Sequence, residues 1–345
     1  MEGWWEMTLP VRWGVLGTAR IAERYVVPAI AASDNGRVIA VSSGSGSEKA
    51  VAERLGIPRA YPSHDQLLAD PDVDAVYIPL PNVLHRDWTI RAAEAGKHVL
   101  CEKPIALSRR QFDEVEAACA ANRVHVAEAF MYRHHPQIGA VRDLLQRGRI
   151  GEVVAVEARF HFILDPAAGP NIRLDPALGG GALRDIGCYP IDLMNLLMGG
   201  PPTEVASVAV TRRDVRVETS IAAVLRYGTV LGSWDCSFHS PAGDSCVVIG
   251  SSGTIELRHP FRPDQNGGNG VSIVSSGGGA DTVEVHGDVY RLEVEAFARR
   301  ILADEPDEPN TELSRWTVET TERVAQAAGL PPFETEASSA GRTAG

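Results

Sequence analysis

The segment VRWGVLGTARIA, residues 11–22, decides the fold of this chain. Its first half is a short apolar run, typical of a buried strand, and a helical pattern begins in its second half. Gly17 can make the tight turn between strand and helix, and Ala22 allows the two to pack closely, as in the dinucleotide-binding fingerprint. Ala19 replaces the middle glycine of that fingerprint, so the motif alone is a weak match, and a plain loop of small residues is the alternative.

Strands and helices alternate after this segment. Apolar runs predict strands at 11–17, 37–43, 73–80, 98–101 and 124–128. Helical patterns lie at 21–32, 48–55, 87–95, 108–122 and 136–146. Strands that alternate with helices of this length form parallel βαβ units. We therefore predict an α/β Rossmann domain, with a doubly wound parallel sheet that binds a dinucleotide, over residues 11–130.

Beyond residue 151 the pattern changes to short strands separated by turn residues. The predicted strands lie at 153–162, 204–211, 220–226, 230–238, 245–250 and 253–258, and the predicted helices at 185–197, 291–302 and 312–328. This order predicts an α+β domain over residues 131–335 with a large, mostly antiparallel open sheet. The segment 265–280 is rich in glycine, asparagine and serine, so we expect a mobile loop there. Residues 1–10 and 336–345 are expected to be flexible termini.

Composition argues against several classes of protein. The net charge of −12 argues against a nucleic-acid partner, which requires a clustered basic face. Every apolar run is too short to cross a bilayer, and no secretory signal is apparent, so we expect a cytoplasmic protein without a membrane partner. The five cysteines are scattered without a CxxC pair, so neither a metal site nor a disulfide framework is predicted.

The end of the second predicted strand bears on the choice of dinucleotide. Proteins that bind NAD usually carry an acid about 20 residues past the glycine loop, whereas residues 42–47 here read SSGSGS. Hydroxyls, free backbone amides and a nearby lysine can hold the extra phosphate of NADP, which a carboxylate would repel. We therefore predict NADP, with NAD possible and a plain flexible turn as the alternative. The residues expected at the cofactor are Gly17, Thr18, Ala19, Arg20, Ile21, Ser43, Gly44, Ser45 and Lys49.

Two further motifs contain candidate catalytic residues. CEKP, residues 101–104, follows a predicted strand, and ligands of open α/β sheets bind at the carboxyl ends of strands. Lys103 should therefore face the cofactor crevice. The motif GGGALRDIGCYPID, residues 179–192, leads from a glycine-rich turn into a helix, where Asp185 and Tyr189 are four residues apart and share a face. The structural alternatives are a solvated lysine, an aspartate at a helix start and a core tyrosine.

Five motifs in this order resemble the Gfo/Idh/MocA family of oxidoreductases, and within it the branch of dimeric dihydrodiol dehydrogenase and NADP-dependent xylose dehydrogenase. They are GVLGTARIA, VDAVYIPLPNVLH, GKHVLCEKP, EAFMYRHHPQ and GGGALRDIGCYPID, spread over about residues 11–195. The resemblance implies that Lys103 is catalytic and that Asp185 and Tyr189 form the catalytic pair of the second domain. It also implies cofactor contacts, including the nicotinamide ribose and the phosphate, for Pro81, Asn82, His85, Glu102, Lys103, Ser43 and Lys49.

These residues predict hydride transfer between NADP and a sugar-like alcohol or ketone, with an aldose 1-dehydrogenase as the first choice. The alternatives are a keto-sugar reductase, a trans-dihydrodiol dehydrogenase and a regulator that senses the dinucleotide without chemistry. Lys103 would favour the phenolate of Tyr189, and Asp185 would fix Lys103 or a substrate hydroxyl. Arg133 is a further candidate for contact with the sugar or cyclic polyol. We expect a homodimer or homotetramer formed through the second sheet.

Overall fold

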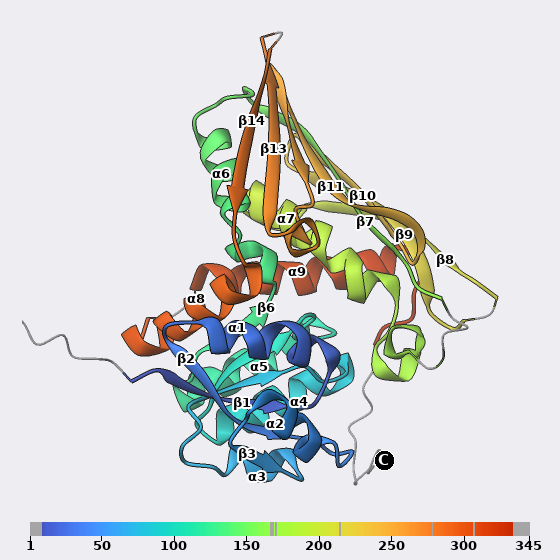
Figure 1. Cartoon of the computed structure of the whole chain (residues 1–345). Helices are drawn as coiled ribbons and strands as arrows, with labels where there is room; N and C mark the ends of the chain where they lie inside the picture. Colours follow the sequence, from blue (N-terminus) through green and yellow to red (C-terminus); the bar gives the residue numbers. More distant parts are fainter. Residues whose placement is uncertain are drawn as a thin grey trace, which may run out of the picture.

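The computed structural model describes residues 9–165, 169, 171–213, 215–277, 279–305 and 308–333. The predicted flexible termini therefore lie outside the described residues, apart from residues 9 and 10. The chain forms two sheets, one from its first third and one from the remainder, with the last two helices lying between them (Figure 1). No helix in the described part of the chain is long and apolar enough to cross a membrane.

The first sheet has six parallel strands in the order β3-β2-β1-β4-β5-β6. The strands are β1 (Val11–Leu16), β2 (Gly36–Ser42), β3 (Arg59–Tyr61), β4 (Ala75–Ile78), β5 (His98–Glu102) and β6 (Val126–Ala129). This is the Rossmann order, in which the strand sequence reverses between β1 and β4 and opens a crevice at the carboxyl ends. The predicted α/β class is confirmed, although the sequence reading missed β3, whose three residues are too few to show a period.

Helices cover both faces of this sheet. They are the π-helical turn η1 (Ala22–Val26), α1 (Val27–Ala32), α2 (Glu48–Leu55), α3 (His64–Leu68), α4 (Asn82–Glu94) and α5 (Arg109–Asn122). The helix predicted over 21–32 forms with a π-helical first turn. Helix α4 begins five residues earlier than predicted, directly after Pro81, whose φ of −57° suits the residue before a helix. The short helix α3 was not predicted.

Within the described residues, the second sheet has eight strands in the order β14-β13-β12-β11-β7-β10-β9-β8, and only β7 and β10 pair in parallel. The strands are β7 (Val153–Ile163), β8 (Glu204–Thr211), β9 (Glu218–Tyr227), β10 (Val230–Ser237), β11 (His239–Gly250), β12 (Gly253–Arg258), β13 (Asn269–Ser276) and β14 (Gly279–His286). The expectation of a mobile loop over 265–280 is wrong, because strand β13 lies within this segment. This strand buries Ser272 and Val274, and a serine in the core position concealed the alternation.

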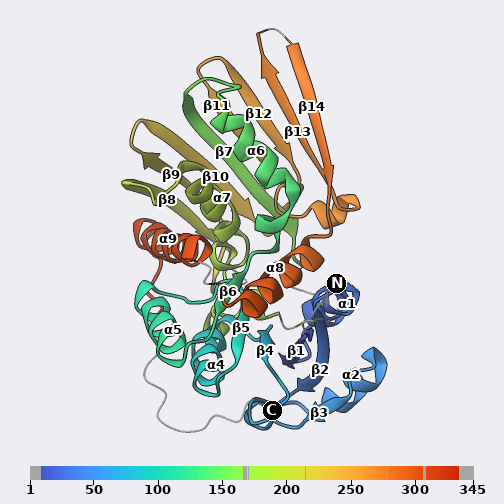
Figure 2. The same ribbon diagram turned by 90° about the vertical axis from the view of Figure 1, so that its left-hand side faces the viewer.

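One face of the second sheet is covered by helices and the other is open (Figure 2). The other helical segments of the described residues are η2 (Met131–His134), α6 (Pro136–Gln146), η4 (Ile172–Leu174), η5 (Pro176–Leu178), η6 (Leu183–Gly187), α7 (Cys188–Met198), η7 (Pro263–Asn266), α8 (Val289–Ala303) and α9 (Glu308–Ala327). Alternation along β7 to β10 turns Val156, Ile221 and Leu225 toward the helices. Val154, Val208, Val210, Val224 and Leu231, which are on the open face, are each at least half exposed.

The end of the chain packs against its beginning. The rings of Trp13 on β1 and Phe297 on α8 have centroids 5.7 Å apart. The amide of Asn35, just before β2, donates a hydrogen bond of 2.9 Å to the carbonyl oxygen of Glu295. Helix α9 in turn contacts strand β6 of the first sheet and helix α5 on that sheet. It also contacts strand β8 of the second sheet and helix α7. The two halves are therefore joined by the last two helices as well as by the direct connection after β6.

Candidate active site

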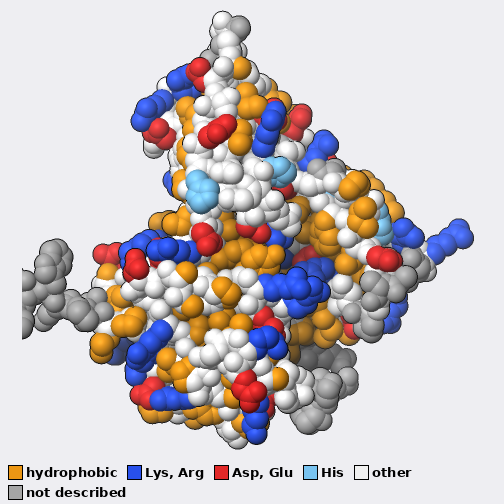
Figure 3. Space-filling view, in the orientation of Figure 1, with side chains coloured by type: hydrophobic (Ala, Val, Ile, Leu, Met, Phe, Trp, Pro, Cys, Tyr) orange, Lys and Arg blue, Asp and Glu red, His pale blue; other side chains and the backbone are white. Residues whose placement is uncertain are grey.

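Most of the residues predicted from the sequence lie at the carboxyl edge of the first sheet. The turn at Gly17 follows β1, Ser43 follows β2, Pro81 follows β4 and Lys103 follows β5. The helical turn with Asp185 and Tyr189 approaches this edge from the second half of the chain. Figure 3 shows that the molecular surface is hollowed where the two halves meet, with Lys and Arg side chains along the lower edge of the hollow.

The turn after β1 has the geometry of a dinucleotide loop. Gly17 has a φ of +120°, and a Cβ atom there would lie 3.1 Å from Cδ2 of Leu80, so only glycine suits the position. The side chains of Thr18, Ala19 and Ile21 are partly exposed, and that of Arg20 is exposed. The first backbone amides of a helix attract phosphate groups, so this turn fits the pyrophosphate of a dinucleotide.

Four hydroxyl groups form a cluster at the end of β2. The Ser43 Oγ lies 2.8 Å from that of Ser45 and 3.0 Å from that of Ser47, and Thr18 Oγ1 lies 2.8 Å from Ser47 Oγ. We call these four residues the hydroxyl cluster. Gly44 has open space on its Cβ side, and Lys49 is exposed on the first turn of α2. Hydroxyls that can donate, together with the exposed ammonium of Lys49, fit a phosphate ester on the adenosine ribose.

Lys103 and Asp185 form an ion pair between the two halves of the chain. The Lys103 Nζ donates to the main-chain oxygen of Asp185 at 2.5 Å and to its Oδ1 at 3.1 Å, and the two side chains are 12% and 13% exposed. Burial lowers the pKa of Lys103, but the Asp185 carboxylate and Glu102 outweigh it, so the pKa is raised overall. Burial likewise raises the pKa of Asp185, but Lys103 and Arg173 lower it below its ordinary value. Both groups are therefore charged at neutral pH.

Tyr189 lies below the lysine but does not present its hydroxyl to it. The Lys103 Nζ is 5.2 Å from the centroid of the Tyr189 ring, while the phenol hydroxyl donates to Met131 Sδ at 3.6 Å. The ring packs edge-on against Phe130 and Phe160. Burial and the nearby Glu102 carboxylate raise the pKa of Tyr189 well above 10. The expectation that Lys103 favours the phenolate is therefore wrong for this arrangement, because the ammonium faces the ring and the phenol keeps its proton.

Arg173, on η4, is a site residue that the sequence reading missed. Its Nε donates to Asp185 Oδ2 at 2.7 Å, so the Asp185 carboxylate bridges two cations. The Arg173 side chain is 43% exposed, and the Asp185 carboxylate raises its pKa. No periodicity marks the segment around η4, so only the fold reveals this contact.

Glu102 lies beside Lys103 at the end of β5. Its Oε1 accepts a hydrogen bond of 2.6 Å from the hydroxyl of Tyr77. Burial raises the pKa of the Glu102 carboxyl, although Lys103 and this hydrogen bond oppose the shift. The residue remains partly exposed, so it can reach a ribose hydroxyl at the crevice.

The residues after β4 have different roles. His85 is 1% exposed, and its ring nitrogens lie 2.8 Å from the Pro104 oxygen and 2.7 Å from the Leu80 oxygen. It therefore ties together the turns after β4 and β5, and the direct cofactor contact expected for it is not supported. The side-chain amide of Asn82 donates to the Gly179 oxygen at 3.0 Å, which joins α4 to the second half of the chain.

Arg133 is not at the crevice. Its side chain is 4% exposed, and its guanidinium is held by both carboxylate oxygens of Asp192 and by Ser314 Oγ at 3.2 Å. It also lies 4.6 Å from the centroid of the Phe130 ring. With every side of the guanidinium occupied by protein, the expected substrate contact of Arg133 is not supported, and the residue joins η2 to α7 and α9.

Comparison with known protein families matches both halves of the chain. Residues 11–130 match a family model described as an oxidoreductase family with an NAD-binding Rossmann fold. Residues 138–256 match the model of the GFO/IDH/MocA C-terminal domain.

Several curated relatives act on sugars or cyclic diols. D-xylose 1-dehydrogenase (NADP(+)) 2 of Haloferax volcanii is 37% identical over 316 residues, which cover 91% of this chain and 96% of the relative. A dTDP-3,4-didehydro-2,6-dideoxy-alpha-D-glucose 3-reductase of Actinomadura kijaniata is 35% identical, and the match covers 86% of this chain and 89% of the relative. The human trans-1,2-dihydrobenzene-1,2-diol dehydrogenase is 31% identical, and the match covers 73% of this chain and 75% of the relative.

Solved structures share the architecture. A 3-ketoreductase of Actinomadura kijaniata, in complex with NADP and TDP-benzene, superimposes with a TM-score of 0.86 at 32% identity, covering 92% of this chain and 98% of the other. An aldose-aldose oxidoreductase of Caulobacter crescentus, complexed with glycerol, superimposes with a TM-score of 0.85 at 26% identity, covering 93% and 98%.

Proposed function

Because the chain belongs to the GFO/IDH/MocA oxidoreductase family, we propose that it oxidises the anomeric carbon of a free aldose with NADP, as a D-xylose 1-dehydrogenase does. The chain is an NADP-dependent oxidoreductase that acts on a sugar-like substrate, and the choice of an aldose is our proposal. The Gly17 turn would hold the pyrophosphate and the hydroxyl cluster the additional phosphate.

The observation that carries the proposal is the position of the Lys103 ammonium. It lies on the Asp185 carboxylate and above the Tyr189 ring, at the carboxyl edge of β5. A substrate hydroxyl bound at Nζ would lie next to a fixed positive charge in a site partly shielded from water. This charge would stabilise the hydroxyl oxygen as it gains negative charge. NADP, when bound, accepts the hydride from the carbon that bears this oxygen. Asp185, held in turn by Arg173, would keep the ammonium in place.

The protonation states of the site favour an anomeric hydroxyl. Tyr189 and Lys103 both keep their protons at neutral pH, so neither is ready to remove a proton from an alcohol. The anomeric hydroxyl ionises more readily than an ordinary alcohol, because the ring oxygen withdraws electrons from its carbon. A cation that stabilises the resulting anion can then suffice, with the proton passing to water. The hydroxyls of an inositol or a dihydrodiol lack this advantage.

Reduction of a keto-sugar is the second candidate, and the protonated phenol favours it. In that direction Tyr189 can donate its proton to the carbonyl oxygen while the carbon accepts the hydride. An assay that follows the absorbance of the reduced nicotinamide separates the candidates. We expect oxidation of D-xylose or D-glucose with NADP and little turnover of inositols or dihydrodiols. Turnover of keto-sugars with reduced NADP, without oxidation of any aldose, would contradict the aldose proposal and support the second candidate.

Ser43→Asp tests the proposed phosphate site. A carboxylate in the hydroxyl cluster would repel the additional phosphate of NADP, and we expect kcat/KM for NADP to fall by about 10- to 100-fold, which corresponds to the loss of one hydrogen bond to a charged group. The value for NAD should change little. Ser43→Ala, which adds no charge, serves as the control. An unchanged ratio of the two cofactors in Ser43→Asp would place the phosphate elsewhere.

We also propose that two copies of the chain associate through the open face of the second sheet. The exposed fractions of its apolar side chains are 51% for Val154, 73% for Val208, 56% for Val210, 50% for Val224 and 54% for Leu231. Val208 and Val224 line the same surface pocket on this face, and exposed apolar patches mark interaction sites. Val208→Glu combined with Val224→Glu should convert a dimer or tetramer to a monomer, measured by light scattering after size exclusion. Unchanged mass of the double variant would exclude this face as the interface.

A further inference from the structure

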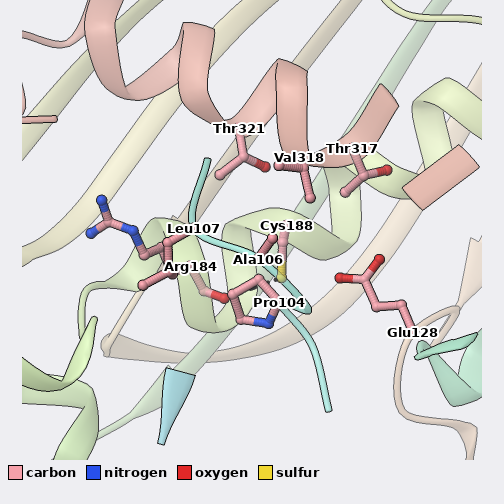
Figure 4. Close-up of a pocket in the computed structure, with 9 residues that line it drawn as sticks. All are labelled: Pro104, Ala106, Leu107, Glu128, Arg184, Cys188, Thr317, Val318 and Thr321. Atoms are coloured by element: carbon pink, nitrogen blue, oxygen red, sulfur yellow. Dashed lines mark hydrogen bonds between the residues drawn. The ribbon is translucent and has the colours of Figure 1, made fainter. Parts of the chain in front are cut away.

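Two adjoining cavities border the segments that contain the candidate catalytic residues. The smaller has a volume of about 10 Å³ and is lined by Pro104, Arg184 and Cys188, among others (Figure 4). These three are the chain neighbours of Lys103, Asp185 and Tyr189. The larger cavity has a volume of about 560 Å³ and shares Leu107, Arg184 and Thr321 with the smaller one. An occupant of either cavity would therefore contact Arg184, the residue next to Asp185.

The larger cavity has the size and lining of a ligand site. Pockets for small organic ligands have volumes of about 300–1,000 Å³, with mostly apolar walls and a few polar groups. Here the walls include Leu183, Ala325, Leu330, Pro331 and Phe333. They come from η6, from α9 and from the segment after α9, and Leu107 of the first half also lines the cavity, so the cavity lies at the junction of the two halves of the chain.

Arg184 is the cation of this cavity. It donates a long hydrogen bond of 3.4 Å to the Gly180 oxygen, and its guanidinium lies 5.3 Å from the centroid of the Phe333 ring. No carboxylate of the described residues forms an ion pair with it. Burial lowers the pKa of Arg184, although the more distant Glu218 carboxylate opposes this shift. A largely buried guanidinium without an acid partner is costly, because buried charges are normally paired.

Two further polar atoms at the cavities have no hydrogen-bond partner among the described residues. Thr321 lines both cavities and Glu128 lines the smaller one, and Thr321 Oγ1 and Glu128 Oε2 are buried, although Glu128 Oε2 lies 3.8 Å from Nη2 of Arg133. Figure 4 shows Glu128 and the Arg184 guanidinium at opposite ends of the smaller cavity, with Thr321 above it. Buried polar atoms usually have a partner, and the smaller cavity can hold at most one water molecule. That water could join Glu128 to Thr321, but Arg184 would still lack an anion.

We propose that the larger cavity binds a small organic anion with an apolar body, whose carboxylate or phosphate pairs with the Arg184 guanidinium. Glu322 also lines this cavity, and its Oε2 accepts the backbone N–H of Arg109 at 3.1 Å. The anion therefore belongs at the Arg184 end, and the apolar body lies along Leu330 and Phe333. Because Arg184 directly precedes Asp185, such a ligand would also restrain η6 and act on turnover from outside the substrate site.

The probe for this site is 4-phenylbutyrate, and 4-phenylbutan-1-ol is its uncharged analogue. Titration calorimetry is performed on the full chain saturated with NADP, so that the dinucleotide crevice is filled. We expect the acid to bind one site per chain and the alcohol to bind at least about tenfold more weakly, since it cannot pair with a guanidinium. Equal binding of both compounds, or binding of neither, would overturn the proposal. This readout does not depend on turnover of any sugar.

Two variants test if the probe binds in the larger cavity. Arg184→Gln should weaken the acid by about tenfold or more. Ala325→Phe should fill the cavity and remove binding without altering a charge. Arg110→Gln, which replaces an exposed arginine paired with Glu114 on α5, is the matched control and should bind as the unaltered chain does. Thermal melting checks that each variant folds. If Arg184→Gln does not fold, the Ala325→Phe variant alone tests the site. Binding that survives in both variants would contradict the site.

Discussion

Lys103→Ala lowers kcat with an aldose by about 10²- to 10³-fold, the loss that follows removal of one preorganised donor at a developing negative charge. The dissociation constant for NADP should change little, because the turn at Gly17 and the hydroxyl cluster remain. Folding should survive as well, since the Asp185 carboxylate keeps its bond of 2.7 Å from Arg173. Steady-state rates and calorimetry with NADP measure the two effects separately.

Lys103→Met and Lys103→Arg separate charge from packing. Methionine fills a similar volume without charge and should be as slow as alanine. Arginine keeps the charge and should recover part of the rate. Turnover in Lys103→Ala or Lys103→Met close to that of the unaltered chain would remove the ammonium from the mechanism and leave Lys103 as an interdomain ion pair.

Tyr189→Phe should lower the rate of keto-sugar reduction by about 10²- to 10⁴-fold, the usual contribution of a positioned proton donor. The cost to folding should be small, because the hydroxyl bonds only to the sulfur of Met131 among the described residues and the ring contacts with Phe130 and Phe160 remain. In the reductive direction the phenol acts while protonated, and its pKa is well above 10. The dependence on Tyr189 should therefore persist at neutral and mildly alkaline pH and disappear only above its pKa.

Tyr227→Phe is the control for this substitution. Its hydroxyl donates to Asn195 Oδ1 at 2.8 Å within the second half of the chain, so its loss should affect stability more than rate. A near-normal rate for Tyr189→Phe, together with a normal melting temperature, would make Tyr189 a packing residue beneath the lysine.

The first sheet was predictable because each of its longer strands is an apolar run followed by a helical pattern. The motifs also predicted that Lys103 and the serines after β2 share one edge, since strand ends in a parallel sheet lie at the same edge. The structure has both at the strand ends and brings Asp185 to Lys103, while their roles stay predictions. Strands β13 and β14 were not predicted, because a glycine-rich segment with a buried serine has no apolar alternation.

The details of the site depended on contacts that no spacing encodes. Arg173 reaches Asp185 from an irregular segment, and Arg133 is held away from the crevice by Asp192. The protonation of Tyr189 depends on which atom faces Lys103, and the structure sets the ring, not the hydroxyl, against the ammonium. A sequence motif identifies the residues of a site, but the orientation of their side chains decides what chemistry they can perform.

The packing of α8 on β1 has a consequence for synthesis of the chain. Trp13 is completely buried, and its partner Phe297 emerges from the ribosome nearly 300 residues later. Until then the nascent first sheet exposes an indole ring and lacks the helix that covers it. A fragment that stops near residue 130 should for the same reason aggregate more readily than the full chain, and supplying α8 as a separate peptide should reduce that tendency.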